Sequence, residues 1–233
     1  MITLATFLLG GFVGLLIFLY IATFAQRLTQ TVWQDYCELF QLRQREKPMP
    51  HSSWQNKKCG DFLCYIFSFA GLFALCGKLN ADPYVVLWWA TWLSLVILIS
   101  IIDWLYRLIS PLLCVWLFLW TLLGVHWHII PLSLEQALAS AVGILLIFYS
   151  ICYISQMIYH KTMLGEGDCW LAFALGAGIF WQKLPHFVFL ACCYAIVFCG
   201  IQKLCRRDGQ QTVQQIPFAP FLSLSALSLL LLR

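Results

Sequence analysis

Long apolar runs with very few charged residues are the feature that most limits what this chain can fold into. Eight such segments follow one another, at 2–25, 62–77, 84–102, 109–125, 136–158, 169–181, 186–203 and 216–232. A helix needs about 20 apolar residues to cross a bilayer. The segments do not alternate in polarity as the strands of a membrane barrel do. We therefore expect an all-α protein, a polytopic transmembrane bundle of about eight helices.

The composition agrees with a membrane location. The chain is 62% hydrophobic and 10% charged, whereas a soluble domain carries about 25% charged residues. A soluble chain this apolar could not cover its surface with polar groups, so the lipid bilayer is the expected partner. The formal net charge is +4, but the basic residues lie in short loops rather than on one face. We therefore expect no nucleic-acid binding.

The basic residues also predict an orientation. With the N-terminus outside, eleven Lys and Arg residues fall on the inner side and three, Lys78, Lys183 and Arg233, on the outer side. The inner ones are Arg27, Arg43, Arg45, Lys47, Lys57, Lys58, Arg107, Lys161, Lys203, Arg206 and Arg207. Cytoplasmic loops of membrane proteins are enriched in Lys and Arg. The bias therefore predicts a multi-pass protein with its N-terminus outside.

One long polar stretch, residues 26–61, interrupts the apolar pattern. It is rich in Gln, Arg and Lys and contains Pro48 and Pro50. We expect a cytoplasmic loop region here rather than a full domain. The chain then divides into 1–61, a first transmembrane helix with its polar loop, and 62–233, a transmembrane bundle. The second and sixth apolar segments are short, so whether they cross the membrane completely stays open.

Two aspartates lie against apolar segments instead of in loops. Asp103 closes the third segment and Asp168 opens the sixth, and both fall at the cytoplasmic edge in the predicted topology. Intramembrane carboxylates are usually functional or paired. A structural role stays open for each. Asp103 could pair with Arg107, four residues on, and Asp168 could cap the helix that it starts.

Two such aspartates on facing helices would support a specific chemistry. Carboxyls a few ångströms apart cannot both ionise easily, so one pKa rises and the pair shares a proton. The ionised member can take a proton from water while the protonated one polarises a scissile carbonyl, as in aspartic proteases. Gly165 and Gly167 fit this reading, because glycine lets a bound peptide approach closely and can adopt positive φ. A turn that begins a helix uses the same residues.

Three blocks in order resemble the type IV prepilin peptidases, a family of bacterial membrane aspartic proteases of the GxGD type. GEGDCWLAFALGAGIFW, Gly165 to Trp181, is similar to the family's GxGD block. IIDWLYRLISP resembles its first-aspartate block, and IPFAPFL, Ile216 to Leu222, its IPFGPFL block. The resemblance covers about residues 85 to 232. It departs from the family at Pro111, one position later than usual, and at Ala219, where glycine is usual.

The resemblance implies a function and a site. Asp103 and Asp168 would be the catalytic pair, with Gly165, Gly167 and, upstream, Lys161 as substrate-binding residues. The enzyme would remove the leader from prepilins or pseudopilins at the cytoplasmic face of the bacterial inner membrane, in type IV pilus assembly or protein secretion. No cofactor is expected. The particular substrate and the oligomeric state stay open.

The N-terminal half differs from the bifunctional members of that family. They carry a domain with two CxxC pairs and methylate the new N-terminus using S-adenosylmethionine. Here the loop offers Cys37, His51, Cys59 and Cys64 but no CxxC. We therefore expect methyltransferase activity to be reduced or absent, and no zinc or other metal site. For the pair His126 and His128, interfacial anchoring is favoured over metal binding.

Two other function classes fit a polytopic chain with membrane-edge carboxylates. A transporter or proton channel would use them as relay groups, but it would also be expected to have charges near the bilayer midplane and internal repeats, and the sequence offers neither. An inactive relative would serve only as a scaffold in a pilus or secretion system. The reduced N-terminal region favours that alternative to some degree.

Overall fold

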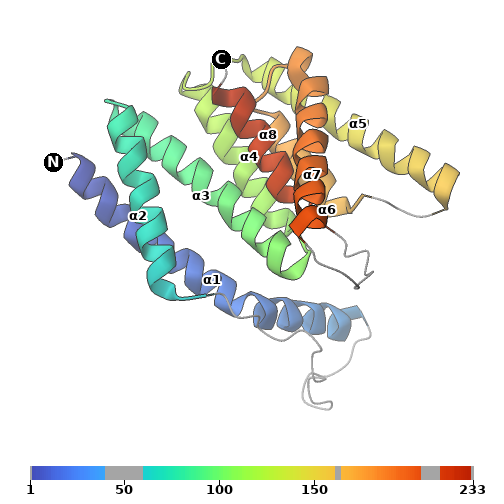
Figure 1. The fold of residues 1–233 in the computed structure, drawn as a ribbon, viewed down its shortest axis with the longest axis horizontal. Coiled ribbons are helices and arrows are strands. Elements are labelled where there is room, and N and C mark those ends of the chain that lie inside the picture. Colours follow the sequence, from blue (N-terminus) through green and yellow to red (C-terminus); the bar gives the residue numbers. More distant parts are fainter. Residues whose placement is uncertain (1, 40–59, 161–163, 206–215, 232–233) are drawn as a thin grey trace. The chain divides into compact units, whose positions relative to one another are not determined.

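The computed structural model describes residues 2–39, 60–160, 164–205 and 216–231 (Figure 1). They form helices and no strand, which confirms the predicted all-α class. In order these are α1 (Ile2–Leu39), α2 (Phe62–Leu79), α3 (Pro83–Tyr106), α4 (Pro111–His126), α5 (Leu134–Tyr159), α6 (Glu166–Gly176), the 3-10 turn η1 (Trp181–Lys183), α7 (Leu184–Cys205) and α8 (Ala219–Leu231).

Five helical segments are long and apolar enough to cross a membrane, namely α1, α2, α3, α5 and the segment from η1 through α7. The chain is therefore a multi-pass membrane protein. By their contacts the residues form two compact units, 1–90 and 91–233, and each is described by itself. The division predicted from the sequence separates the first transmembrane helix with its polar loop, 1–61, from the transmembrane bundle, 62–233, and it stays a prediction.

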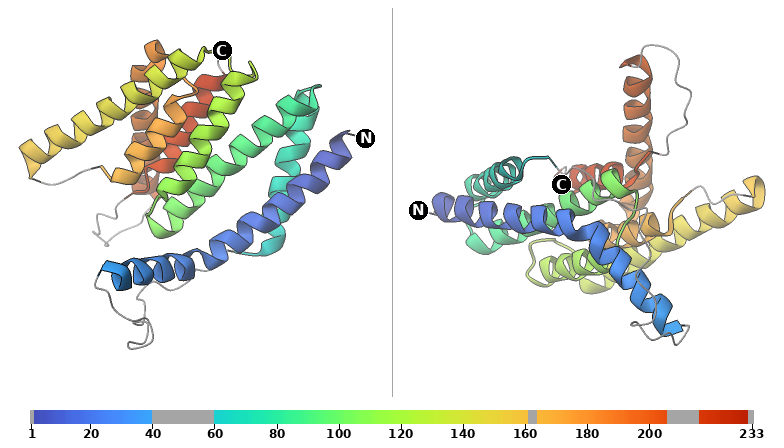
Figure 2. Two further views of the ribbon diagram at one scale, coloured as in Figure 1. Left: turned by 180° about the vertical axis from the view of Figure 1, so that it is seen from behind. Right: turned by 90° about the horizontal axis from the view of Figure 1, so that it is seen from below.

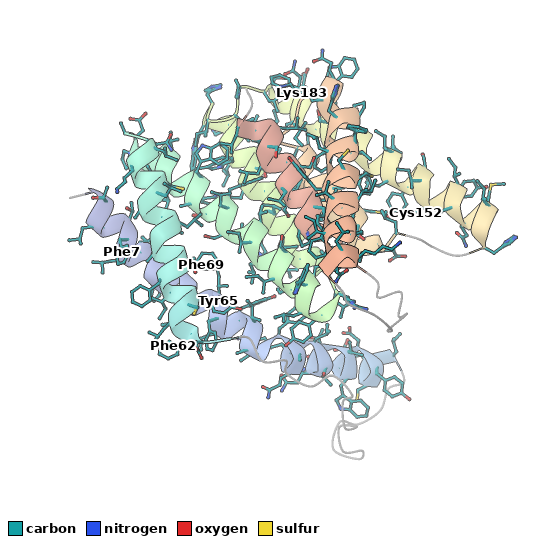
Figure 3. All side chains as sticks on the ribbon, viewed as in Figure 1. Phe7, Phe62, Tyr65, Phe69, Cys152 and Lys183 are labelled. Carbon is teal, nitrogen blue, oxygen red and sulfur yellow. The ribbon has the colours of Figure 1, made fainter. Side chains whose placement is uncertain are left out.

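In the first unit, α1 and α2 lie side by side with their backbones in contact (Figures 1 and 2). A Cβ added to Gly10 would lie 2.5 Å from the carbonyl oxygen of Phe69, and one added to Gly14 would lie 2.6 Å from that of Tyr65. Figure 3 labels Phe69 and Tyr65 on α2. Glycines four residues apart allow this close approach of membrane helices.

The first helix is longer than the apolar run that predicts it. α1 has 38 residues and continues to Leu39, so the expectation of a loop from residue 26 is wrong for this part. No Gly or Pro lies between Arg27 and Leu39, and nothing there breaks the helix. The hydroxyls of Thr29 and Thr31 bond back to carbonyls four residues earlier. The polar residues from Arg27 to Leu39 therefore continue α1 as helix and do not form a loop.

In the second unit, α6 is the central helix. It packs against α4, α5 and α8, and Figure 2 shows it among these neighbours. Its buried residues are Cys169, Leu171, Ala172, Ala174, Leu175 and Gly176. A Cβ on Gly176 would lie 2.5 Å from Cγ2 of Ile144 on α5. A helix that is apolar on nearly every side is one surrounded by protein, and its small residues let the neighbours approach.

The sixth apolar segment forms a helix too short to cross the membrane alone. Its helix has 11 residues, a length of about 16 Å, which is roughly half of the hydrocarbon core. α6 ends at Gly176 instead of continuing to 181, and a turn leads into η1. Whether a short segment can cross the membrane therefore differs between the second and the sixth. α2, with 18 residues, is long enough to span, and α6 alone is not.

The second half of α3 is tied to its neighbours by polar and aromatic contacts. Ser100 and Ser223 share a hydrogen bond of 3.0 Å between α3 and α8. The ring of Phe198 on α7 contacts both Trp104 and Phe221, with centroids 5.7 and 5.4 Å away. These contacts hold the end of α3 against the start of α8.

Candidate active site

Asp103 lies in the last turn of α3 and is almost fully buried, with 6% of its surface exposed. Its Oδ2 accepts a hydrogen bond of 3.0 Å from the backbone N–H of Ala219. Ala219 is the first residue of α8, where backbone N–H groups have no partner inside the helix. The positive end of the helix dipole also favours a carboxylate there.

The alternative role for Asp103 was an ion pair with Arg107. Arg107 lies just after α3, with an exposed side chain and a positive φ of 54°. Its backbone N–H donates to the carbonyl oxygen of Asp103 at 2.8 Å. Within the described part of the chain, the hydrogen-bond partner of the Asp103 carboxylate is Ala219 rather than Arg107. Arg107 therefore ends the helix without a direct contact to the carboxylate, although its charge still acts on that carboxylate.

Asp168 is the third residue of α6, and it caps that helix. Its backbone N–H donates to the carbonyl oxygen of Gly165 at 3.1 Å, and its Oδ2 accepts from the N–H of Gly165 at 3.3 Å. The capping role left open by the sequence is therefore present. It fixes the carboxyl at the start of the helix and does not exclude a chemical role.

The two aspartates lie close enough for the charge of Asp103 to act on the carboxyl of Asp168. Asp103 contacts the start of α8, and α8 packs against α6, which Asp168 begins. The three sequence blocks therefore meet where α3 ends and where α6 and α8 begin. Cys114 of α4 also lies within electrostatic reach of Asp168.

The two glycines of the GEGD turn differ from the expectation in their backbone conformation, and their contact with substrate stays a prediction. Gly165 has φ of −75° and Gly167 is part of α6, so the expected positive φ is wrong for both. Gly167 is required by packing, because an added Cβ would lie 2.7 Å from Cβ of Ile109. Gly165 is exposed, which leaves its backbone accessible to a bound peptide.

Several predicted residues fall outside the described part of the chain. Lys161 is one, so its expected contact with substrate is not described. His51 and Cys59 are two more of the four residues considered for zinc. Of the others, Cys37 is buried and Cys64 is exposed at the start of α2. Among the described residues, no three His, Cys, Asp or Glu side chains gather in a way that could hold a metal ion.

Sequence reasoning missed three neighbours of the site. Ala219 binds Asp103 through its backbone, and Ile109 packs on Gly167. Cys169 lies next to Asp168 in the chain, and its Sγ is 3.9 Å from that of Cys152 on α5, which Figure 3 labels. The IPFAPFL block gave a usable signal for Ala219, because a helix that begins there offers free N–H groups to an anion.

Comparison with known proteins decides the family. The sequence pattern described as the type IV leader peptidase family matches residues 90–200, which include Asp103 and Asp168. A protein of Haemophilus influenzae named prepilin leader peptidase/N-methyltransferase is 37% identical over 227 residues, 97% of this chain and 95% of that protein. The chain belongs to the type IV leader peptidase family. This confirms both the resemblance and the predicted enzyme class, a peptidase.

More distant relatives match only part of this peptidase. Leader peptidase HopD of Salmonella typhimurium is 33% identical over 46% of the chain and 68% of its own length. The type 4 prepilin-like proteins leader peptide-processing enzyme of Escherichia coli is 32% identical over 49% of the chain and 40% of its own length. No solved structure matches the chain.

Proposed function

We propose that this peptidase removes the leader from type IV prepilin-like substrates at the cytoplasmic face of the inner membrane, with Asp103 and Asp168 as its catalytic pair. The observation that carries the proposal is that the end of α3 lies beside the start of α6, where Gly167 packs on Ile109 and the charge of Asp103 reaches the carboxyl of Asp168. The names of the relatives from Haemophilus influenzae and Escherichia coli support the substrate class.

The reaction needs two carboxyls in different protonation states. An ionised carboxylate takes a proton from water, and the oxygen of that water bonds to the scissile carbonyl carbon. The protonated partner donates a hydrogen bond to the carbonyl oxygen and stabilises the charge that develops there. The tetrahedral intermediate then breaks its C–N bond as the carboxyl that took the proton from water gives it to the leaving amine. Gly165, exposed just before Asp168, would hold the substrate backbone near this point, and Lys161 is proposed as a further substrate contact.

A leader-processing assay tests this proposal. A prepilin-like substrate is co-expressed with wild type, Asp103→Asn or Asp168→Ala, and the substrate is analysed by mass spectrometry. We expect removal of the leader with wild type only. Asp82→Asn is the matched control, because Asp82 lies in the turn before α3, and it should process normally. Processing by either site variant would show that the dyad assignment is wrong.

The same assay separates the proposal from the two alternatives. A transporter or proton channel would lose flux in proteoliposomes on Asp103→Asn while cleaving no peptide in its wild-type form. An inactive scaffold would co-purify with pilus or secretion proteins and leave the leader in place. The family to which the chain belongs favours the peptidase over both alternatives.

Methyl transfer is a separate matter. The relative from Haemophilus influenzae is named as an N-methyltransferase too, yet the chain has no CxxC pair. We propose that the peptidase acts with little or no methyl transfer. Purified enzyme given processed substrate and labelled S-adenosylmethionine should incorporate less label than a bifunctional family member with two CxxC pairs. Equal incorporation would contradict this.

The proposed orientation has the N-terminus outside. It rests on the basic residues that follow the first apolar segment, Arg27, Arg43, Arg45, Lys47, Lys57 and Lys58, because cytoplasmic loops are enriched in Lys and Arg. Their assignment does not depend on whether α6 crosses the membrane. An alkaline phosphatase domain is active only outside the cytoplasm, so a fusion to the N-terminus should be active. A fusion placed in the 40–59 segment should be inactive. The opposite pattern would show that the N-terminus lies in the cytoplasm and that the site faces the outside, which would contradict the proposal.

A further inference from the structure

The start of α8 presents one backbone group to the proposed catalytic pair. The N–H of Ala219 donates to Oδ2 of Asp103 at 3.0 Å. Ala219 is 0% exposed and Asp103 is 6% exposed. Water therefore has little access to replace this donor, and the carboxylate depends on it for its fixed position.

Neighbouring contacts hold the donor in place. One turn away on each helix, Ser100 and Ser223 share a hydrogen bond of 3.0 Å. Phe221, in the first turn of α8, packs its ring on Phe198 of α7. The N–H of Ala219 therefore lies at a helix end that both α3 and α7 contact.

The hydrogen bond also removes rotational freedom from the carboxylate. An aspartate on a helix can turn about its terminal torsion, and that torsion has a broad minimum. A donor on Oδ2 selects one orientation of the carboxylate and leaves the other oxygen for the reaction. Catalytic groups gain much of their effect from such a fixed geometry.

We propose that the backbone N–H of Ala219 is the positioning group that holds the carboxylate of Asp103 in its reactive orientation. This inference rests on the proposed function, because orientation matters only if Asp103 takes part in the reaction. The role belongs to the main chain, so it does not depend on the chemistry of the side chain at 219. Glycine, which is usual at this position in the family, would keep the same donor.

The direct test replaces Ala219 by lactic acid, which changes the peptide bond to an ester and removes only the N–H. We expect kcat for leader removal to fall about 10- to 100-fold, the usual effect of losing a hydrogen bond to a charged group. KM should change less than about twofold, because substrate binding does not use this bond. Ala219→Gly keeps the N–H and should keep kcat within about threefold of wild type.

Ala226 supplies the matched control. It lies in the same helix and is also 0% exposed, so lactic acid there removes a backbone N–H of α8 far from Asp103. This ester should leave kcat nearly unchanged. If the two esters lower kcat equally, the N–H of Ala219 has only a structural role and the inference fails. If the ester at 219 leaves kcat unchanged, the inference also fails.

A second variant guards against misfolding of the ester protein. Ala219→Pro removes the same N–H, and proline is tolerated at the first residue of a helix. It should lower kcat as the ester does, and normal kcat would overturn the inference. Asp103→Asn separates the two claims. Full processing by Asp103→Asn would refute the proposed function. If Asp103→Asn is inactive but the ester variant at Ala219 has normal kcat, only the positioning role is refuted.

Discussion

The carboxylate of Asp103 and the backbone N–H of Ala219 form a hydrogen bond of 3.0 Å between residues separated by 116 positions in the sequence. The bond joins the last turn of α3 to the first residue of α8. It satisfies an N–H that the helix cannot satisfy itself, and it gives a buried carboxylate a donor. The same contact thus joins α3 to α8 and fixes the position of the Asp103 carboxylate.

A side chain at position 167 should disturb the packing at the start of α6, next to the site. In Gly167→Ala the new Cβ would lie 2.7 Å from Cβ of Ile109, so the start of α6 must move away from the segment between α3 and α4. Overpacking of this kind lowers stability by about 1–3 kcal/mol. We also expect slower leader removal, because Asp168 is the next residue. Thermal unfolding in detergent and the processing rate measure the two effects.

Gly71→Ala is the control for that substitution, because no heavy atom lies within 4 Å of its added Cβ. It should keep both the wild-type unfolding temperature and the wild-type rate. Equal behaviour of the two variants would show that Gly167 is not packed against Ile109 as described.

The contact between α1 and α2 gives a prediction for the first unit. Gly14→Ala would bring a Cβ to 2.6 Å from the carbonyl oxygen of Tyr65, and a backbone atom cannot turn aside as a side chain can. We expect a loss of about 1–3 kcal/mol in the free energy of unfolding. Gly11→Ala, with its nearest atom at 3.4 Å, should be nearly neutral. If both variants unfold alike, the close approach of the two helices is wrong.

Substitution of two buried serines by alanine should change the free energy of unfolding in opposite directions. The hydroxyl of Ser140 has no hydrogen-bond partner among the described residues, so Ser140→Ala removes an unsatisfied polar group and should stabilise the protein by about 1 kcal/mol. The hydroxyl of Ser225 donates to the carbonyl oxygen of Phe187 at 2.6 Å. Ser225→Ala should therefore destabilise by about 1 kcal/mol. Unfolding temperatures in one detergent test both, and a destabilised Ser140→Ala would contradict the first.

Much of the fold follows from apolar length alone. The helical class and the approximate number of helices come directly from the apolar runs, because lipid leaves the backbone few alternatives. The ends of the helices do not follow so easily. Polar residues after Arg27 continue α1 to Leu39, since helix propensity persists beyond the bilayer. α6 stops at Gly176, although apolar residues follow it.

The site is only partly readable from the sequence. Asp103 and Asp168 stand out because each is a carboxylate against an apolar segment, and the GEGD turn indicates the start of a helix. The bond to Ala219 and the packing of Gly167 on Ile109 depend on how distant helices meet. Local pattern carries no such information. For this reason the packing of Gly167 on Ile109 could not be predicted, and only the positive φ considered for this glycine is wrong.

The most direct measurement is a double-mutant cycle on leader removal, using wild type, Asp103→Asn, Asp168→Asn and the variant that carries both changes. Residues that act as one unit show strongly non-additive losses. We expect each single variant to lose at least about a thousandfold in kcat/KM, and the double variant to lose little more. Additive losses, or a single variant that still removes the leader at close to the wild-type rate, would contradict a shared catalytic pair.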